Sequence, residues 1–497
     1  MSAVHAIAGI ARADLLERLR RRSTLVLLAS TLLCGWWVHT GALGVDVGGW
    51  RGVYDSAWVG MMMTLIVTTL LGLVGFYLVK DPIARDRQTG VGQIVAATPV
   101  STASYLTGKW LSSTGVLLLV LGVLGVAAMA MQLLHGEAPL QPVVLAAPLL
   151  LVAVPALALV AAMALLFETV PLLRGGGGNV AWFFLFLFGL WAGFELLAPR
   201  APGLDPFGAG IFMPSLRASV TALDPGYRGG FTIGGGDAAA TLRTFTWPGI
   251  EWTGTIVLSR FTVLLLAAAI AVVPSLWFDR FDAPPAPARR RPAGWVRGQE
   301  ALARVTGRLG LVGAELRMLL AGQPAWWVLG FLGVAFAGIV NPEAFVAAWL
   351  WPLAAWSALG CRAERDGVLP LLLSTPGGVA RPVLAAWGAG ALLAAIAGLG
   401  TLLRSVADPV AVAAFAAGCA FIPALALACG VWSRGPRLFE VIWLFLWYLG
   451  SLNHAPGLDV ARARSPVVIS AWLAAAGGLL ALGVVGRARA RRSGRGG

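Results

Sequence analysis

Long runs of hydrophobic residues alternate with short polar stretches along most of this chain. A helix that crosses a membrane needs about 20 consecutive apolar residues, and most of the runs approach or exceed that length. The pattern therefore predicts an all-α polytopic membrane protein with about 12 transmembrane helices. We expect these helices near residues 24–40, 57–79, 110–134, 141–166, 180–198, 256–277, 324–341, 344–360, 383–401, 409–432, 438–452 and 466–486.

Two further segments are expected to lie at the membrane surface. In residues 5–22, apolar residues recur at helical spacing beside several arginines, which is typical of an interfacial helix on the inner leaflet. Residues 199–255 are rich in proline, glycine and aromatic residues. We expect an external region of turns and short or re-entrant helices there.

The chain is expected to consist of two transmembrane halves with six helices each. The first half covers residues 1–278 and the second covers residues 310–497. Between them, residues 279–309 are rich in proline and arginine and predict a cytoplasmic linker.

Composition supports a membrane protein. Hydrophobic residues make up 58% of the 497 residues and charged residues only 12%, whereas a soluble chain is about 25% charged. So little charge cannot cover a surface that faces water. The composition argues against a soluble enzyme, a disordered chain and a secreted protein held by disulfides.

The net charge of +14 follows from membrane orientation. With both termini in the cytoplasm, the segments on the inner side carry +17 and those on the outer side carry −3. This asymmetry obeys the positive-inside rule. It explains most of the basic excess, so we expect the lipid bilayer and not a nucleic acid as the partner of these charges.

The two halves also resemble each other in sequence, which indicates an internal duplication. A shift of 277 residues aligns Arg85 with Arg362, Gly90 with Gly367, Val91 with Val368, Thr98-Pro99 with Thr375-Pro376, and Trp110 with Trp387. Farther along, Pro155-Ala-Leu-Ala-Leu159 recurs as Pro423-Ala-Leu-Ala-Leu427. Because both halves begin on the inner side, the repeat is parallel.

Segment 80–109 is polar enough to leave the membrane, and its counterpart is segment 361–381. Apolar residues within segment 80–109 recur at roughly helical spacing, which predicts a short amphipathic helix. Thr98-Pro99 ends that helix, because proline disfavours helical geometry at the residue before it. Ser101 or Thr102 can then cap the next helix.

These paired segments resemble the coupling segments of type-2 ABC transporter permeases. In that family a charged stretch, a glycine, an apolar helix ending in Thr-Pro, and Gly-Lys follow one another after the second span. Residues 84–109 match this order, and residues 362–381 match it without Gly-Lys. Arg87 stands where the family commonly has the glutamate that the second copy keeps as Glu364. The interfacial helix, the external region and the ending WFDRFD at 277–282 also resemble this family.

The resemblance implies a membrane-spanning permease subunit of an ATP-driven ABC transporter, an exporter. A separate ATP-binding cassette subunit, in two copies, would bind ATP and Mg²⁺, and this chain would bind no cofactor. The implied location is the inner (cytoplasmic) membrane of a bacterium. The implied contacts with the ATP-binding subunits are Arg85, Arg87, Gly90, Gln93, Thr98, Pro99, Arg362, Glu364, Gly367, Thr375 and Pro376.

The sequence contains no pattern for chemistry of its own. The P-loop pattern GxxxxGK[ST] is absent, and the glycine run at 175–178 is not followed by lysine. The four cysteines and four histidines show no metal-ligand spacing. We therefore expect no catalytic residues, no metal site and no enzyme activity in this chain.

Two other functions are compatible with the hydropathy pattern. A twelve-span secondary carrier is one, although the intramembrane acidic residues on which such carriers depend are scarce here. A polytopic membrane enzyme that uses residues 199–255 is the other. Gradient-driven transport without ATP would favour the carrier, and activity of the isolated chain would favour the enzyme.

Overall fold

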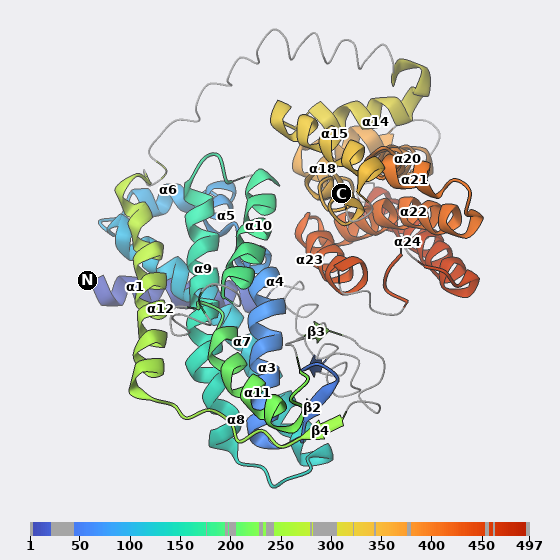
Figure 1. The fold of residues 1–497 in the computed structure, drawn as a ribbon. Coiled ribbons are helices and arrows are strands. Elements are labelled where there is room, and N and C mark those ends of the chain that lie inside the picture. The colour runs from blue at the N-terminus through green and yellow to red at the C-terminus, as the bar shows by residue number, and fades with distance from the viewer. Residues whose placement is uncertain are drawn as a thin grey trace. The chain divides into compact units, whose positions relative to one another are not determined.

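The structure is a computed structural model in which the chain is mostly helical (Figure 1). It divides into two compact units, Met1–Ala286 and Pro287–Gly497. This division falls within residues 279–309, where the sequence predicts the linker. The structure describes residues 3–20, 44–174, 176–193, 197, 205–227, 232–234, 243–278, 281, 306–321, 323–341, 344–374, 379–452, 457–460 and 463–493.

The first unit is built around a long interrupted helical run. The run consists of α3 (Ser56–Ile66), η1 (Val67–Leu71), α4 (Gly72–Val79) and α5 (Pro82–Gln88). Asp55 begins it, because its side chain accepts a hydrogen bond from the Trp58 backbone N–H at 2.8 Å. The most apolar stretch of this run is 89% buried, so the run forms the core of the unit.

The remaining helices of this unit pack against that core or against one another. They are α1 (Ala3–Leu19), α6 (Val91–Ala96), α7 (Thr102–His135), α8 (Pro142–Pro148), η2 (Leu149–Ala153), α9 (Val154–Thr169), α10 (Gly176–Ala192), α11 (Ala209–Leu223), α12 (Gly254–Val272) and η5 (Val273–Leu276). The Ser101 hydroxyl accepts a hydrogen bond from the Ser104 N–H at 3.2 Å, which confirms Ser101 as the cap of α7. α7 therefore begins eight residues before the predicted span at residue 110.

Four short strands join the region 199–255 to residues that follow the first predicted span. β1 (Gly44–Asp46) pairs antiparallel with β3 (Thr232–Gly234), and β2 (Trp50–Gly52) pairs parallel with β4 (Arg243–Phe245). α11 supplies a short helix of the kind expected in this region. The strands themselves were not predicted.

The second unit is built from shorter pieces and three long helices. Its elements are η6 (Gly307–Leu309), α14 (Gly310–Ala321), α15 (Ala325–Val340), α16 (Ala344–Ala348), α17 (Leu353–Trp356), α18 (Arg362–Arg365), α19 (Leu369–Ser374), α20 (Ala380–Ala397), α21 (Leu399–Ser405), α22 (Pro409–Ser433), α23 (Arg437–Trp447), η7 (Tyr448–Leu452) and α24 (Pro466–Ser493). α22 packs against both α20 and α24 and forms the centre of the unit.

Long apolar helices mark the chain as a membrane-spanning protein. Within the described residues, seven helices are long and apolar enough to cross a membrane, or eight if the bent pair Gly307–Ala321 and Ala325–Val340 forms one span. Two predicted spans, 180–198 and 344–360, contain shorter apolar helices, and the predicted span 24–40 lies outside the described residues. Twelve spans thus stays a prediction.

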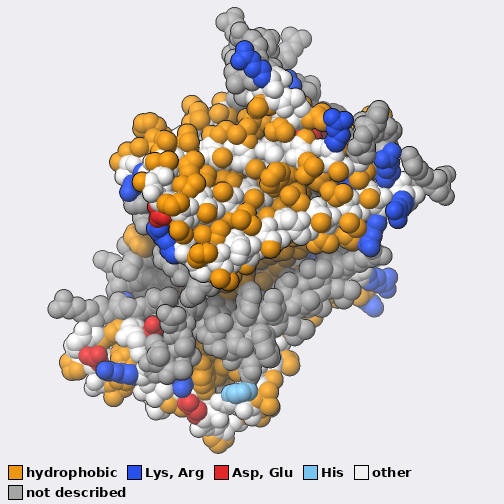
Figure 2. Space-filling view, turned by 90° about the vertical axis from the view of Figure 1, so that its right-hand side faces the viewer, with side chains coloured by type: hydrophobic (Ala, Val, Ile, Leu, Met, Phe, Trp, Pro, Cys, Tyr) orange, Lys and Arg blue, Asp and Glu red, His pale blue; other side chains and the backbone are white. Residues whose placement is uncertain are grey.

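Some of these helices expose their apolar residues to the surroundings. Only 22% of the most apolar stretch of Gly254–Leu276 is buried, and only 17% of that of Pro466–Arg492. Figure 2 shows a broad apolar face on the second unit with basic side chains at its edges. Such a face is suited to lipid, because hydrocarbon solvates apolar side chains and cationic residues favour the membrane boundary.

Candidate functional site

The polar segment 80–109 contains two short helices, α5 and α6, that meet at a glycine. Gly90 has a left-handed backbone conformation with φ of +77°. Residues with a side chain rarely adopt this φ, so glycine permits the sharp turn between the helices. After α6, the Thr98 hydroxyl donates a hydrogen bond to the Val95 carbonyl at 2.7 Å, and the exposed Pro99 follows.

α6 buries one residue and exposes its neighbours. A Cβ added to Gly92 would lie 2.7 Å from the Phe281 ring, so glycine allows this close contact. Val91 is 42% exposed, Ile94 is 67% exposed, and Gln93 is exposed as well. Since side chains three residues apart share one face of a helix, Val91 and Ile94 form a small apolar surface.

The residues after α12 hold α6 in place. The Phe281 ring lies 5.8 Å from the Phe278 ring and 5.9 Å from the Tyr105 ring, edge to face in both cases. The Arg87 guanidinium lies 5.7 Å from the centre of the Phe281 ring, which allows a cation–π interaction. Phe278 and Phe281 of the ending WFDRFD thus pack against the polar segment.

A buried carboxylate on α1, Asp14, joins α1 to the polar segment. Asp14 Oδ1 lies 2.5 Å from Arg85 Nη2 and 2.8 Å from Lys109 Nζ. Asp14 Oδ2 accepts hydrogen bonds from Arg18 at 2.8 Å and Ser112 at 2.6 Å. The buried side of α1 is therefore partly charged, whereas the sequence pattern predicted an apolar side.

The charge of Asp14 is stabilised by its neighbours. Burial alone would raise the pKa of Asp14. The positive charges of Arg18 and Lys109, with hydrogen bonds from Lys109 and Ser112, hold the pKa of this carboxyl well below its usual range. Asp14 is consequently ionised at neutral pH.

Gly108 and Lys109 each have a structural role. A Cβ added to Gly108 would lie 2.8 Å from Ile10 Cγ2, so glycine lets α1 approach α7 closely. Lys109 Nζ also lies 2.7 Å from Asp86 Oδ2, and the Tyr105 hydroxyl donates to the same oxygen at 2.7 Å. Lys109 thereby joins α7 to α5 as well as to α1.

The second unit repeats the two-helix arrangement. Gly367 lies between α18 and α19 with φ of +70°. Val368 is 40% exposed and Leu371 is 69% exposed. At the shift of 277 residues, these two residues correspond to Val91 and Ile94, whose exposed fractions are nearly the same.

An acidic residue on a preceding helix holds the second segment too. Arg362 forms an ion pair with Glu315 of α14, as Arg85 does with Asp14 of α1. α14 packs against α20. The sequence prediction missed α14 as a counterpart of α1, although Ala314-Glu315-Leu316 resembles Ala13-Asp14-Leu15.

Glu364 has a different neighbour from its counterpart Arg87. Glu364 Oε1 lies 3.8 Å from Arg487 Nη1 and 4.0 Å from Arg434 Nε. Arg487 Nη2 donates a hydrogen bond to the Gly360 carbonyl at 2.6 Å. Glu364 therefore joins the second segment to the end of α24.

The predicted contact residues fall into three groups. Arg85 and Arg362 pair with internal carboxylates, so they position the helices. Arg87, Gln93, Pro99 and Gly367 are exposed, whereas Gly90, Thr98 and Glu364 are partly exposed. Thr375 and Pro376 lie outside the described residues. The prediction did not include Val91, Ile94, Val368 and Leu371, whose exposure is not visible in the sequence.

No protein-family model and no curated protein matches this chain. Within the described residues, no group of three or more His, Cys, Asp and Glu could hold a metal ion. The candidate site therefore rests on the arrangement of its residues alone. Each unit has a pair of short helices with an exposed apolar pair at or near the start of the second helix, and an ion pair anchors the first helix to another helix.

Proposed function

We propose that this chain is the membrane-spanning permease subunit of an ATP-driven ABC transporter, an exporter. It would lie in the inner membrane of a bacterium with both termini in the cytoplasm. The observation that carries this proposal is the repeated helix pair with its left-handed glycine and its exposed apolar residues. Those are Val91 and Ile94 in the first unit, and Val368 and Leu371 in the second.

The shape of each helix pair suits docking into a groove on a partner protein. Recognition of a helix in a groove depends on a few apolar anchors at spacings of three or four residues, with polar edges around them. Ile94 supplies such an anchor, and Gln93 of the same helix and Arg87 of α5 are exposed polar residues. Each unit offers one such helix, so we propose two copies of the ATP-binding subunit.

The contacts of the first segment would transmit a movement of the docked helix to the long helices of the first unit. Arg85 and Lys109 tie α5, α1 and α7 together through Asp14. On the other side, the Ala84 N–H donates a hydrogen bond to Glu168 Oε1 of α9 at 2.6 Å. A displacement of α6 by a partner would therefore reach α7 and α9, which are both parts of candidate spans.

The ATP-binding subunits would supply the ATP hydrolysis for which this chain has no sequence motif. ATP and Mg²⁺ would bind to the ATP-binding subunits, since this chain has no P-loop. Closure of these subunits around ATP would move the docked helices.

A charge placed in the apolar pair tests this function. We expect Ile94→Asp and Leu371→Asp each to lower permease-stimulated ATP hydrolysis at least about tenfold, because burying a charge in place of an apolar side chain costs more than about 1.4 kcal/mol. Val406→Asp is the matched control, since Val406 is 70% exposed but lies between α21 and α22. Normal stimulation by both test variants would overturn the proposal.

A further inference from the structure

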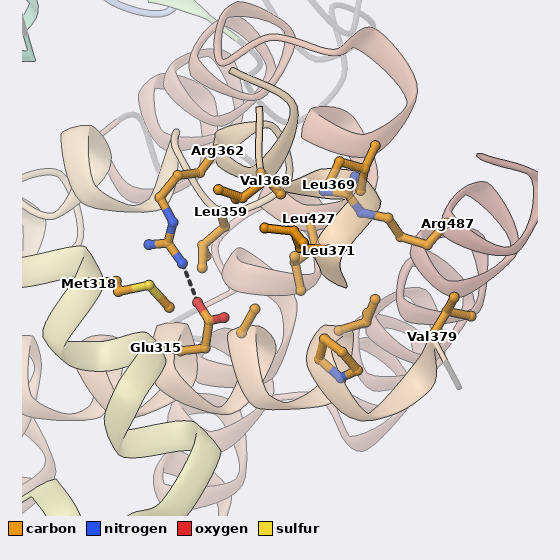
Figure 3. A pocket seen from close by; sticks show the side chains of 14 residues that line it. Glu315, Met318, Leu359, Arg362, Val368, Leu369, Leu371, Val379, Leu427 and Arg487 are labelled. Carbon is orange, nitrogen blue, oxygen red and sulfur yellow. Dashed lines mark hydrogen bonds and ion pairs between the residues drawn. The ribbon is translucent and has the colours of Figure 1, made fainter. Parts of the chain in front are cut away.

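A cavity of about 290 Å³ lies in the second unit beside α18 and α19 (Figure 3). Its lining is mostly apolar, and its charged residues are Glu315, Arg362 and Arg487. Figure 3 shows the Glu315–Arg362 ion pair at one side and Arg487 at the other, with Leu359 and Leu427 between them. The cavity thus combines an apolar interior with two guanidinium groups.

The internal repeat explains why this space is open. The shift of 277 residues aligns Asp86 with Ala363, Tyr105 with Pro382 and Lys109 with Ala386. In the first unit, the three larger side chains join one another through contacts of 2.7 Å. In the second unit, the three smaller residues all line the cavity. The second unit therefore has a hollow at the aligned positions where the first unit has a polar cluster.

Two of the arginines that line this cavity each have a buried nitrogen atom without a hydrogen-bond acceptor among the described residues. These atoms are Arg362 Nη1 and Arg487 Nη1. The Arg487 side chain is only 10% exposed, and the 3.8 Å from its Nη1 to Glu364 Oε1 is too long for a hydrogen bond. Buried donors without acceptors are unfavourable, so an acceptor supplied by a ligand would stabilise them.

The charges beside the cavity favour an anion. Two of the charged residues that line the cavity are arginines, Arg362 and Arg487, and one is a carboxylate, Glu315. Glu364, whose Oε2 also has no hydrogen-bond partner among the described residues, is not one of the residues that line the cavity. The lining residues therefore carry one net positive charge.

We propose that this cavity binds the head group and adjoining aliphatic carbons of an anionic amphiphile. Arg362 and Arg487 would donate charge-assisted hydrogen bonds to its carboxylate or phosphate oxygens, and the apolar lining would hold the chain. The volume lies at the small end of ligand pockets, about 300 Å³, so it accommodates one head group and a short length of chain. This proposal does not depend on the transport function.

Fluorescence titration of the purified full-length protein with cis-parinaric acid, a long-chain carboxylate, tests the site. We expect Arg487→Gln to weaken binding about tenfold, as loss of a charged hydrogen bond does. Ala386→Leu should abolish binding because it fills the cavity. Arg492→Gln removes the same charge from an exposed position on the same helix and should bind as the wild type does.

Two further measurements complete this experiment. Gel filtration of each variant separates loss of the site from loss of the fold. Native mass spectrometry from phosphatidylglycerol nanodiscs, beside displacement of cis-parinaric acid by oleate, distinguishes a membrane lipid from a free fatty acid. Equal binding by the wild type, Arg487→Gln and Ala386→Leu would overturn the proposal, as would an equal loss in Arg492→Gln.

Discussion

At the scale of single residues, the two units differ most where their helices are held together. Asp14 has three cationic partners, Arg18, Arg85 and Lys109. Its counterpart Glu315 pairs with Arg362, and alanine occupies the place of the lysine. The first unit therefore depends on a buried ionised carboxylate, and its stability should respond to acid.

We expect Asp14→Asn to remove an acid-sensitive contribution to stability. The pKa of Asp14 in the fold lies below its value of about 3.9 in an unfolded chain. The contribution is therefore fully present at neutral pH and is lost as the pH falls below about 5. The variant should be less stable at pH 7 by about 3–5 kcal/mol, because buried cations lose their partner. Its stability should also change less between pH 5 and pH 3.

Thermal unfolding in detergent across this pH range measures the effect. Glu17→Gln is the control, since Glu17 pairs with Arg85 at 3.0 Å but its side chain is 55% exposed. That variant should keep the pH dependence of the wild type. An unchanged acid response in Asp14→Asn would show that Asp14 is not the responsible group.

At the scale of elements, the short helices α6 and α19 depend on their surroundings for their positions. Each has six residues, and a helix that short is not stable by itself in water. The left-handed glycines set the angle at which each begins, and Phe281 fixes α6 through Gly92. A change in either glycine should therefore disturb the exposed apolar pair.

We expect Gly90→Ala and Gly367→Ala each to reduce permease-stimulated ATP hydrolysis about fivefold. A side chain in the left-handed region costs roughly 1–2 kcal/mol, which shifts the helix pair away from its docking conformation. Gly122→Ala in α7 is the matched control, because an added Cβ there meets nothing within 4 Å. Full stimulation by both test variants would mean that the angle between the short helices is unimportant.

The sequence predicts the long helices well and the short elements poorly. Predicted span 409–432 is observed as Pro409–Ser433 because its apolar run has clear ends. Strand β1 (Gly44–Asp46) pairs with β3 (Thr232–Gly234), which is far along the sequence, and three-residue strands give no local pattern. Predicted span 344–360 is divided into α16, α17 and turns, which hydropathy alone does not reveal.

The sequence predicts which segment forms the candidate site, but it does not predict which side chains of that segment are exposed. The charged stretch, the glycine and Thr-Pro identify where the chain turns. Which side chains face outward depends on Phe281, far along the sequence, and on Asp14 before the segment. The internal ion pair between Arg85 and Asp14 is one contact that the sequence does not predict.

At the scale of the whole molecule, the two compact units each carry one helix pair of the same design. A single chain would then present both docking helices of a complete transporter. We expect native mass spectrometry of the purified complex to give one permease chain with two ATP-binding subunits. A complex with two permease chains would contradict the idea that the duplicated chain suffices.

Site-specific photo-crosslinking in native membranes tests the central claim most directly. A photoreactive amino acid would replace Ile94 or Leu371, with Val406 as the exposed control. We expect positions 94 and 371 both to crosslink to a protein that carries a P-loop, and position 406 not to do so. If neither position 94 nor position 371 crosslinks to an ATP-binding subunit, these helices do not couple ATP hydrolysis to this chain.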